Sequence, residues 1–382
     1  MSKSSSFHRD EFLIRMQRVE GAMDRAGLDA LIGYSVGNQR GPAAYLGGYE
    51  TSLGLHDVTL FVITPKGSPR YALLTNAYWD KPKERTWPDD IFVTGDFGKK
   101  LAELLPSSIK RLGIAGYKFF PLPIYEALHT ALPAARFEDA TDLLKEVAKI
   151  KSPQEIEIMR EVARLSEVGV QAFLDGVKEG IRERLLVDDI ERAMIKAGAD
   201  GLSFPTILMT GSQVVDSIGF ASSRSLVKGE QVNILSGALY QGYGDELARV
   251  TTIGQPSKKV RAIMEATAEM HEAMQGTVRP GVPAADVAQA SIAVARKYGM
   301  DSYLFKSFNT SAVQGHGMGC WYQEPPSIYP ESKDILETNM LVILEARLGK
   351  PGVGGAVITE PWVVTSTGGE RLVKLPLRTW PS

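Results

Sequence analysis

A histidine and several acidic residues in the second half of the chain are the side chains best placed to do chemistry. His316 stands between two glycines, which let a backbone pack closely around it. Glu345 closes the apolar run 341–344, so its carboxylate is expected to be buried and to need a partner. Glu360 is in a similar position, and for both glutamates a structural ion pair is the alternative. Such residues predict acid–base or metal chemistry, because clustered carboxylates raise one another's pKa and hard cations prefer carboxylate oxygen.

Three further charged residues lie beside these positions, and two interpretations stay open for each. Asp245 and Glu246 stand at the end of a predicted strand, where they face either the acidic cluster or solvent. Arg347 follows Glu345 by two residues. Its guanidinium is either a bidentate clamp for a substrate carboxylate or part of a surface salt bridge.

The segments that must position these side chains form an internal repeat. In each half the stretch between two glycines has the pattern of one helix, and the strand pattern of 228–235 recurs at 338–345. Two copies of a helix–helix–strand–strand unit, related by approximate two-fold symmetry, predict one curved sheet with helices outside. The matching positions, each shifted by 101 residues, are Gly180, Gly198 and Asp200 in the first half and Gly281, Gly299 and Asp301 in the second.

The first part of the chain alternates helices and strands to about residue 147, which predicts a compact α/β domain. Apolar spacing predicts a helix over 11–27 that ends at Gly27, and strands over 58–64 and 71–75. The sequence Ser152-Pro-Gln-Glu155 has the pattern of a capping box and predicts the start of a long helix. The domain organisation that follows is a polar N-terminus over 1–10, an N-terminal domain over 11–150 and a C-terminal domain over 151–382.

Composition excludes several classes of partner. The net charge is −2, from 43 basic and 45 acidic residues, so bulk charge holds neither a nucleic acid nor a membrane surface. No apolar run reaches the roughly 18 residues that a membrane span needs, and the first ten residues lack the apolar stretch of a signal peptide. Cys320 is the single cysteine, which excludes an intrachain disulfide and favours the cytoplasm.

The order and spacing of several motifs resemble the creatinase, prolidase and aminopeptidase P family. The motifs are Ile150-Lys-Ser-Pro-Gln-Glu155, Arg279-Pro-Gly-Val282, Gly242-Tyr243, Gly315-His-Gly-Met-Gly319 with Glu324 and Pro326, Leu344-Glu345, and Ile358-Thr-Glu360 with Val363-Val-Thr365. The resemblance covers roughly residues 11–380. It implies an α+β fold, with a creatinase-like N-terminal α/β domain and a C-terminal pita-bread domain with a pseudo-two-fold internal repeat. It also implies a small-molecule substrate and a homodimer.

The resemblance carries an expected set of metal ligands. Metallopeptidases of this family hold two divalent ions with two aspartates, one histidine and two glutamates. The first aspartate falls on Leu235, which cannot bind a metal, and the second falls on Glu246, with Asp245 as a less favoured neighbour. The resemblance therefore implies at most one ion (Mn, Zn or Fe), or catalysis without a metal. The ligands that remain for a mononuclear site are Glu246, His316, Glu345 and Glu360.

Two more departures from the family pattern concern the substrate. The histidines with which the peptidases contact the substrate or the developing oxyanion fall on Ile218 and Gln323. Glutamine can still donate a hydrogen bond, whereas isoleucine cannot. Creatinase, which works without a metal on the same fold, uses a glutamate that falls on Ala248. Ordinary aminopeptidase action and creatine hydrolysis are both disfavoured.

We therefore predict a hydrolase of a C–N bond, in an amide, amidine or related group, of a small polar molecule. Glu345, His316 and Glu360 are the predicted catalytic residues. The alternatives are an Xaa-Pro aminopeptidase or dipeptidase, a C–X lyase on the same fold, and a non-catalytic binding protein. The predicted substrate-binding residues are Arg347, Gln323, Tyr243, Trp321 and Ile218.

Overall fold

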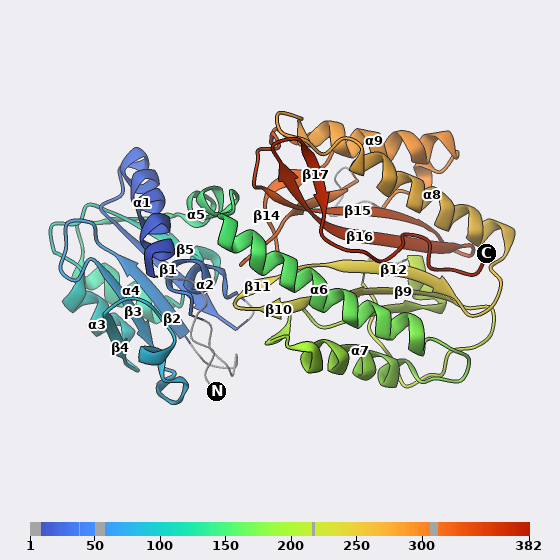
Figure 1. The fold of residues 1–382 in the computed structure, drawn as a ribbon. Coiled ribbons are helices and arrows are strands. Elements are labelled where there is room, and N and C mark those ends of the chain that lie inside the picture. The colour runs from blue at the N-terminus through green and yellow to red at the C-terminus, as the bar shows by residue number, and fades with distance from the viewer. Residues whose placement is uncertain (1–8, 38, 50–57, 216–217, 306–311) are drawn as a thin grey trace. The chain divides into compact units, whose positions relative to one another are not determined.

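The computed structural model describes residues 9–37, 39–49, 58–215, 218–305 and 312–382. It divides into two compact units, Met1–Ala148 and Lys149–Ser382 (Figure 1). Of the predicted polar N-terminus, residues 1–8 lie outside the described residues, and Arg9 and Asp10 open the first helix. Among the helices of the described ranges, none is long and apolar enough to cross a membrane.

The N-terminal unit is built on a mixed sheet with the strand order β4-β3-β2-β1-β5-β6. Strand β1 pairs antiparallel with β2 and parallel with β5. The strands are β1 (Ala30–Val36), β2 (Val58–Ile63), β3 (Tyr71–Thr75), β4 (Asp90–Val93), β5 (Arg111–Ala115) and β6 (Arg136–Asp139). The helices are α1 (Arg9–Ala26), α2 (Gly41–Gly47), α3 (Phe97–Leu104), α4 (Leu122–Ala131) and α5 (Thr141–Ala148).

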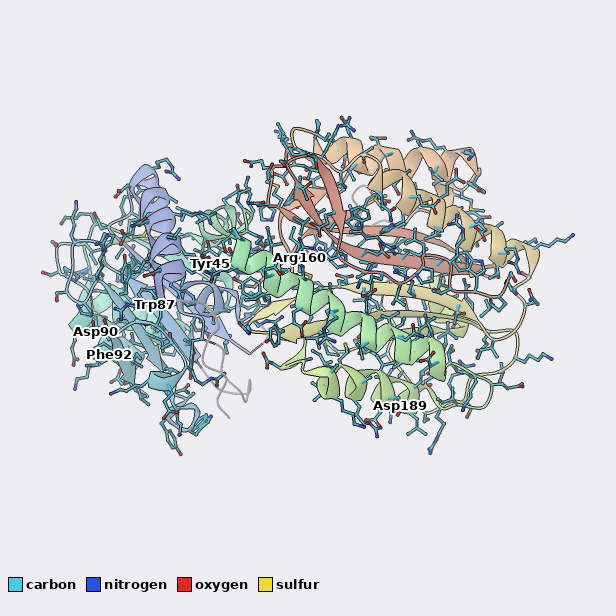
Figure 2. All side chains as sticks on the ribbon, viewed as in Figure 1. Tyr45, Trp87, Asp90, Phe92, Arg160 and Asp189 are labelled. Atoms are coloured by element: carbon cyan, nitrogen blue, oxygen red, sulfur yellow. The ribbon has the colours of Figure 1, made fainter. Side chains whose placement is uncertain are left out.

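Aromatic packing joins the first helix of this unit to its sheet. The ring of Trp87 stacks on that of Phe12 with centroids 5.8 Å apart, and its Nε1 donates to Leu46 O at 2.7 Å. The position of Trp87 is marked in Figure 2. The half-buried Trp87, with its N–H satisfied, is a packing residue rather than part of a site.

The C-terminal unit contains a larger sheet with the strand order β14-β13-β15-β16-β12-β9-β8, and β17 pairs with β16. A small sheet runs in the order β11-β10-β7. The strands are β7 (Gly201–Leu202), β8 (Ile207–Thr210), β9 (Gln231–Ser236), β10 (Ala238–Tyr240), β11 (Tyr243–Gly244), β12 (Leu247–Thr252), β13 (Gly315–Gly317), β14 (Glu324–Ile328), β15 (Leu341–Lys350), β16 (Gly354–Thr365) and β17 (Gly368–Arg371). The helices are α6 (Pro153–Gly176), α7 (Glu183–Ala197), α8 (Lys258–Gln275) and α9 (Ala284–Lys297).

The helices of this unit come in two pairs, α6 with α7 and α8 with α9 (Figure 1). Helix α6 packs against β9, β10 and β12, and α8 packs against β15 and β16. A separate cluster of buried apolar side chains lies under each pair. Burial of these two apolar layers supplies the main driving force that holds the helices on the sheet.

The internal repeat and the predicted helix start are confirmed. Ser152 Oγ accepts from Glu155 N at 3.2 Å and Glu155 Oε2 accepts from Ser152 N at 2.9 Å, so the capping box opens α6. Helices α7 and α9 each lie between two glycines of the repeat. All four glycines have positive φ, which glycine adopts without strain. The angles are +84° at Gly180, +115° at Gly198, +81° at Gly281 and +66° at Gly299.

Candidate metal centre and active site

One row of residues crosses the large sheet and defines the face that carries the site. Glu345 in β15 pairs with Thr359 in β16, Thr359 pairs with Ala248 in β12, and Ala248 pairs with Leu235 in β9. Directly paired residues point to the same face of a sheet, and successive residues alternate between faces. The row continues to Ile207 in β8, which pairs with Leu235. All five of its side chains, Glu345 included, therefore point to the same face of the sheet.

His316 reaches this face from β13, and Glu246 reaches it from the residue directly before β12. His316 in β13 pairs with Ile343, which is two residues before Glu345 and points to the same face. Glu246 lies two residues before Ala248, next to the start of β12. The sheet thus brings together three residues that are far apart in the sequence.

Glu246, His316 and Glu345 form a tight, buried cluster. His316 Nε2 lies 3.2 Å from Glu345 Oε1 and 3.5 Å from Glu246 Oε2. One potential ligand atom from each residue lies within 4.8 Å of the others. His316 Nδ1 lies 2.9 Å from Gly317 O, which can only accept. The proton of a neutral His316 therefore stands on Nδ1, and Nε2 keeps its lone pair toward the carboxylates.

Several polar atoms of this cluster have no hydrogen-bond partner within the described part of the chain. They are both carboxylate oxygens of Glu246 and Nε2 of His316, and all are buried. Buried polar atoms of this kind are costly unless something satisfies them. Two carboxylates and an imidazole are suitable ligands for a divalent cation such as Mn²⁺, Zn²⁺ or Fe²⁺. The residues present therefore fit one metal ion.

The charges of the cluster shift the pKa values of its members. Burial by itself lowers the pKa of His316, but the carboxylates of Glu246 and Glu345 outweigh it and raise the pKa to about 10. Burial raises the pKa of Glu345, and the opposing positive charges of Arg347 and His316 bring the net shift downward. Without a cation, His316 is therefore protonated at neutral pH and Glu345 is ionised.

Arg347 belongs to the same cluster. Its Nη2 lies 3.0 Å from Glu345 Oε2 and 3.6 Å from Glu246 Oε1, and its side chain is 18% exposed. A surface salt bridge would be largely in water, so this arginine is part of the site. Its guanidinium supplies a fixed positive charge next to the two carboxylates.

Two described positions beside the cluster carry side chains without a carboxylate. Leu235 packs in a buried apolar cluster with Ile207, Met209, Ala248 and Val357. Thr359, the residue paired with Glu345, is buried and offers a hydroxyl instead of a carboxylate. The divergence predicted at Leu235 therefore removes one ligand, and the strand register adds Thr359 as a second neutral position.

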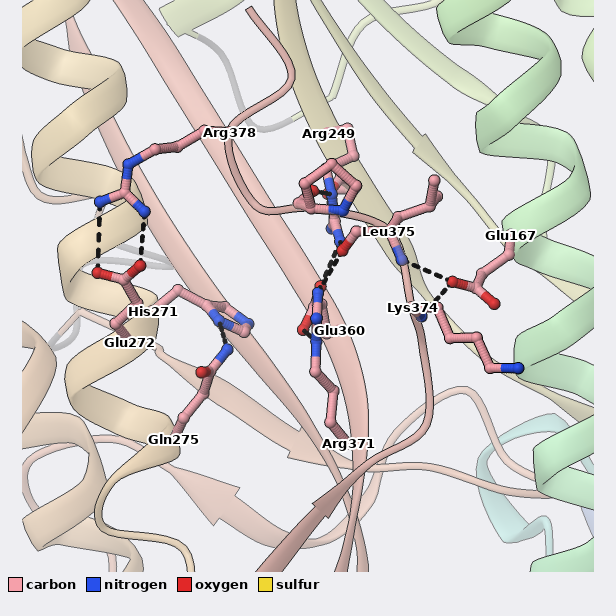
Figure 3. A network of polar contacts seen from close by, with 12 residues as sticks. Glu167, Arg249, His271, Glu272, Gln275, Glu360, Arg371, Lys374, Leu375 and Arg378 are labelled. Carbon is pink, nitrogen blue, oxygen red and sulfur yellow. Dashed lines mark hydrogen bonds and ion pairs between the residues drawn. The ribbon is translucent and has the colours of Figure 1, made fainter.

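The prediction that Glu360 joins this cluster is wrong. Glu360 is the residue after Thr359 in β16, so its side chain points to the opposite face of the sheet. There it bonds to Arg249, and Arg371 donates to it from Nε at 2.8 Å and from Nη2 at 2.6 Å (Figure 3). The structural ion pair that the sequence left open is the arrangement found, and Glu360 is neither a metal ligand nor a catalytic residue here.

Comparison with known proteins identifies the family. Residues 157–366 match the metallopeptidase family M24, and residues 15–148 match the creatinase/prolidase N-terminal domain. The first match covers more than half of the chain. This chain belongs to metallopeptidase family M24. The resemblance in the motifs is thereby confirmed, as is the fold that it implied, with a creatinase-like N-terminal α/β domain and a C-terminal pita-bread domain.

Relatives within family M24 cover most of the chain. An Xaa-Pro dipeptidase from Pyrococcus horikoshii is 28% identical over 278 residues, which are 72% of this chain and 77% of the relative. The crystal structure of a prolidase from the same organism has a TM-score of 0.83 at 24% identity, over 95% of this chain and 98% of that one. An X-Pro aminopeptidase from Thermotoga maritima has a TM-score of 0.81 at 23% identity, over 94% and 98% of the two chains.

Two of the other predicted site residues of this M24 protein have partners elsewhere. Tyr243 is buried, and its hydroxyl donates to Glu155 Oε1 at 2.8 Å, next to the start of α6. Asp245 is buried and accepts from Ser166, and its burial raises its pKa well above the usual value. Neither side chain is a member of the metal-ligand cluster. Their predicted roles in substrate or metal binding are therefore corrected to roles in the packing of α6 on the small sheet and β12.

Of the remaining predicted residues, two lie between β13 and β14, and Ile218 lies between β8 and β9. Trp321 is buried and Gln323 is exposed, both after β13, and Ile218 is 58% exposed. Tyr322, between the first two, was not among the predicted site residues. The residue is 41% exposed, but its ring centroid lies 6.0 Å from that of His316, and partial burial with the negative charges of Glu246 and Glu345 raises its pKa. The sequence gave one signal for it, since Trp321 and Tyr322 both follow the His316 loop closely and one of them was expected to line a pocket.

Proposed function

We propose that this protein hydrolyses the C–N bond of an amide in a dipeptide or a related N-acyl amino acid. The observation that carries the proposal is the buried cluster of Glu246, His316 and Glu345, whose unpartnered oxygen and nitrogen atoms fit one divalent cation. The names of the relatives in family M24 favour dipeptides, Xaa-Pro among them, over creatine-like amidines.

Glu246, His316 and Glu345 would hold the ion. A bound divalent ion polarises a carbonyl and makes water nucleophilic at neutral pH. Arg347 fixes one oxygen of Glu345 and so leaves the other oxygen, Oε1, directed at His316. The low pKa of Glu345 keeps it ionised through neutral pH, as a ligand or a proton acceptor must be.

Tyr322 replaces, as a hydrogen-bond donor to the developing oxyanion, the histidines of the family that are Ile218 and Gln323 in this chain. Because its pKa is raised, its hydroxyl keeps its proton through neutral pH and can donate to a developing oxyanion. Its ring lies between His316 and Phe204, with centroids 6.0 and 5.4 Å away. The loss of one such donor typically costs about 100- to 1000-fold in rate.

The test is a panel of dipeptides incubated with the protein in the presence of Mn²⁺, with release of the free amino acid as the readout. Hydrolysis of at least one dipeptide, lost in Glu345→Gln and reduced about 100-fold or more in Tyr322→Phe, is expected. Gln171→Leu, on an exposed turn of α6, is the control and should keep full turnover. Absence of turnover on every dipeptide and N-acyl amino acid of the panel would contradict the proposal and leave a binding protein.

A further inference from the structure

A small cavity opens next to the candidate metal centre, on the same face of the sheet. Its volume is about 20 Å³, little more than one water molecule needs. Met209 and Asn233, which are paired between β8 and β9, line one side, and Arg347 and Val357, which are paired between β15 and β16, line another. A space of this size takes an end group of a ligand rather than a whole molecule.

Asn233 presents a buried acceptor with no donor. Its Nδ2 donates to Val214 O at 3.3 Å and to Gly355 O at 3.1 Å. Because both partners are carbonyl oxygens, which only accept, the amide cannot be turned the other way. Oδ1 is therefore fixed opposite these contacts, and among the residues with described positions none donates to it.

Arg347 presents a donor in the same cavity. Its Nη2 is occupied by Glu345, but its Nε–H is buried and finds no acceptor in the described ranges of the chain. With a divalent ion on Glu246 and Glu345, the formal charges of the ion, Arg347 and the two carboxylates leave one positive charge in excess. A buried site of this kind favours an anion, and the planar guanidinium is suited to a carboxylate.

We propose that this cavity is the subsite for the C-terminal end of the substrate, with Arg347 binding the carboxylate and Asn233 Oδ1 accepting the N–H of the amide to be cleaved. The inference rests on the proposed hydrolysis and defines its substrate class as amides whose nitrogen carries a hydrogen. Proline, whose amide nitrogen has no hydrogen, leaves Asn233 unpaired. The subsite would thus separate this protein from relatives named for Xaa-Pro substrates.

The spacing along β15 suits such a substrate. Glu345 and Arg347 are two residues apart on one face, a step of about 6.6 Å. One amino-acid residue spans about 3.5 Å, so an amide carbonyl beside Glu345 brings the carboxylate that follows it within reach of Arg347. A buried acceptor that meets the N–H of such an amide discriminates against a nitrogen that cannot donate.

The test is calorimetric titration of the Mn²⁺-loaded protein with three small probes, with release of the amino acid checked in each sample so that binding alone is compared. N-acetyl-L-alanine carries both features, N-acetyl-N-methyl-L-alanine lacks only the N–H, and N-acetyl-L-alaninamide lacks only the carboxylate. We expect the first to bind about tenfold or more tightly than either of the others. Equal affinity for the first two, or no binding of any probe, would overturn the proposal and leave a cavity filled by water.

Two variants test whether Asn233 and Arg347 are the residues that cause the preference between the probes. Asn233→Leu should remove the preference for the N–H probe, and Arg347→Met should weaken both carboxylate probes about equally. A preference that survives in Asn233→Leu contradicts the assignment. Because Asn233→Leu also loses two hydrogen bonds, its melting temperature is measured alongside, and the probe comparison on the unchanged protein needs no variant. Gln171→Leu, which removes an exposed carboxamide on α6, is the matched control.

Binding is read without turnover, so the two proposals fail separately. The expected probe pattern without hydrolysis of any dipeptide would remove the enzymatic proposal and keep the subsite. Hydrolysis of a dipeptide with no discrimination between the probes would remove the subsite and keep the enzymatic proposal.

Discussion

At the scale of single residues, a carboxylate has one of two roles, depending on which face of the sheet it occupies. Glu345 faces His316, as a metal ligand beside it must, whereas Glu360 is held between two arginines on the helix side. His271 lies on that side too, fully buried in α8 (Figure 3). The two faces should therefore respond differently to substitution and to pH.

Glu360→Gln should cost stability and spare the metal. Arg249 is completely buried, and without the charge of Glu360 it keeps an uncompensated positive charge in the interior. A loss of about 3–5 kcal/mol in the free energy of unfolding is expected, measured by denaturant titration. Glu345→Gln is the paired variant, and it should lose the metal at a smaller cost in stability. Loss of the ion in Glu360→Gln, with the protein still folded, would show that the site assignment is wrong.

His271 should make the protein less stable in acid. Burial and the nearby charges of Arg249 and Arg371 outweigh the charge of Glu360 and lower the pKa of His271 to about 4. The unfolded chain binds the proton from about pH 6.5 downward while the folded chain does not, so stability falls as the pH drops from 6.5 to 4. In His271→Gln, the loss of unfolding free energy between pH 6.5 and pH 4, measured by denaturant titration at each pH, should be smaller by about 2–3 kcal/mol. The exposed His129→Gln should leave the slope unchanged, and an equal slope in both variants would contradict the assignment.

The sequence predicted which residue types form the site better than it predicted which face of the sheet each side chain points to. Glu345 and His316 were found because an apolar run and flanking glycines mark buried positions near a strand end. Glu360 was misplaced because a shift of one residue along a strand moves a side chain to the other face, and only the pairing of β15 with β16 fixes that register. Asn233 gave no signal, since its role depends on carbonyl groups of Val214 and Gly355 far away in the chain.

At the scale of elements, the site depends on close contact between β13 and its neighbours. A Cβ atom on Gly315, whose φ is +146°, would overlap Ile343 O in β15. The same holds for Gly317 against Pro325 O. Gly315 therefore sets the separation of β13, which carries His316, from β15, which carries Glu345, and Gly317 sets the separation of β13 from β14. The sequence indicated this close packing, but it did not show which strand makes the contact.

Gly315→Ala should disrupt the site as well as the fold. The added methyl group must push β13 away from β15, and the backbone angle is unfavourable for alanine, so a loss of about 2 kcal/mol or more is expected. Affinity for Mn²⁺ should fall with it, measured by titration calorimetry. Gly281→Ala is the control, because its φ of +81° is also positive but a Cβ there meets open space. It should cost about 1 kcal/mol and leave the metal affinity unchanged, and equal metal binding in the two variants would contradict this role for Gly315.

At the scale of the whole molecule, all residues of the proposed site belong to the unit Lys149–Ser382. The pseudo-repeat could be predicted from the sequence, because glycines at helix ends are required by backbone geometry wherever the unit recurs. The homodimer implied by the family resemblance stays a prediction. Light scattering in dilute buffer should give about twice the chain mass of 41.7 kDa, and a mass equal to one chain would contradict it.

The most direct test is the anomalous diffraction of Mn²⁺ in a crystal of the protein. One peak per chain is predicted, in contact with Glu246, His316 and Glu345, with none beside Leu235 or Glu360. Two peaks per chain, a peak next to Glu360, or no peak at a saturating concentration of the ion would contradict a mononuclear centre at this position.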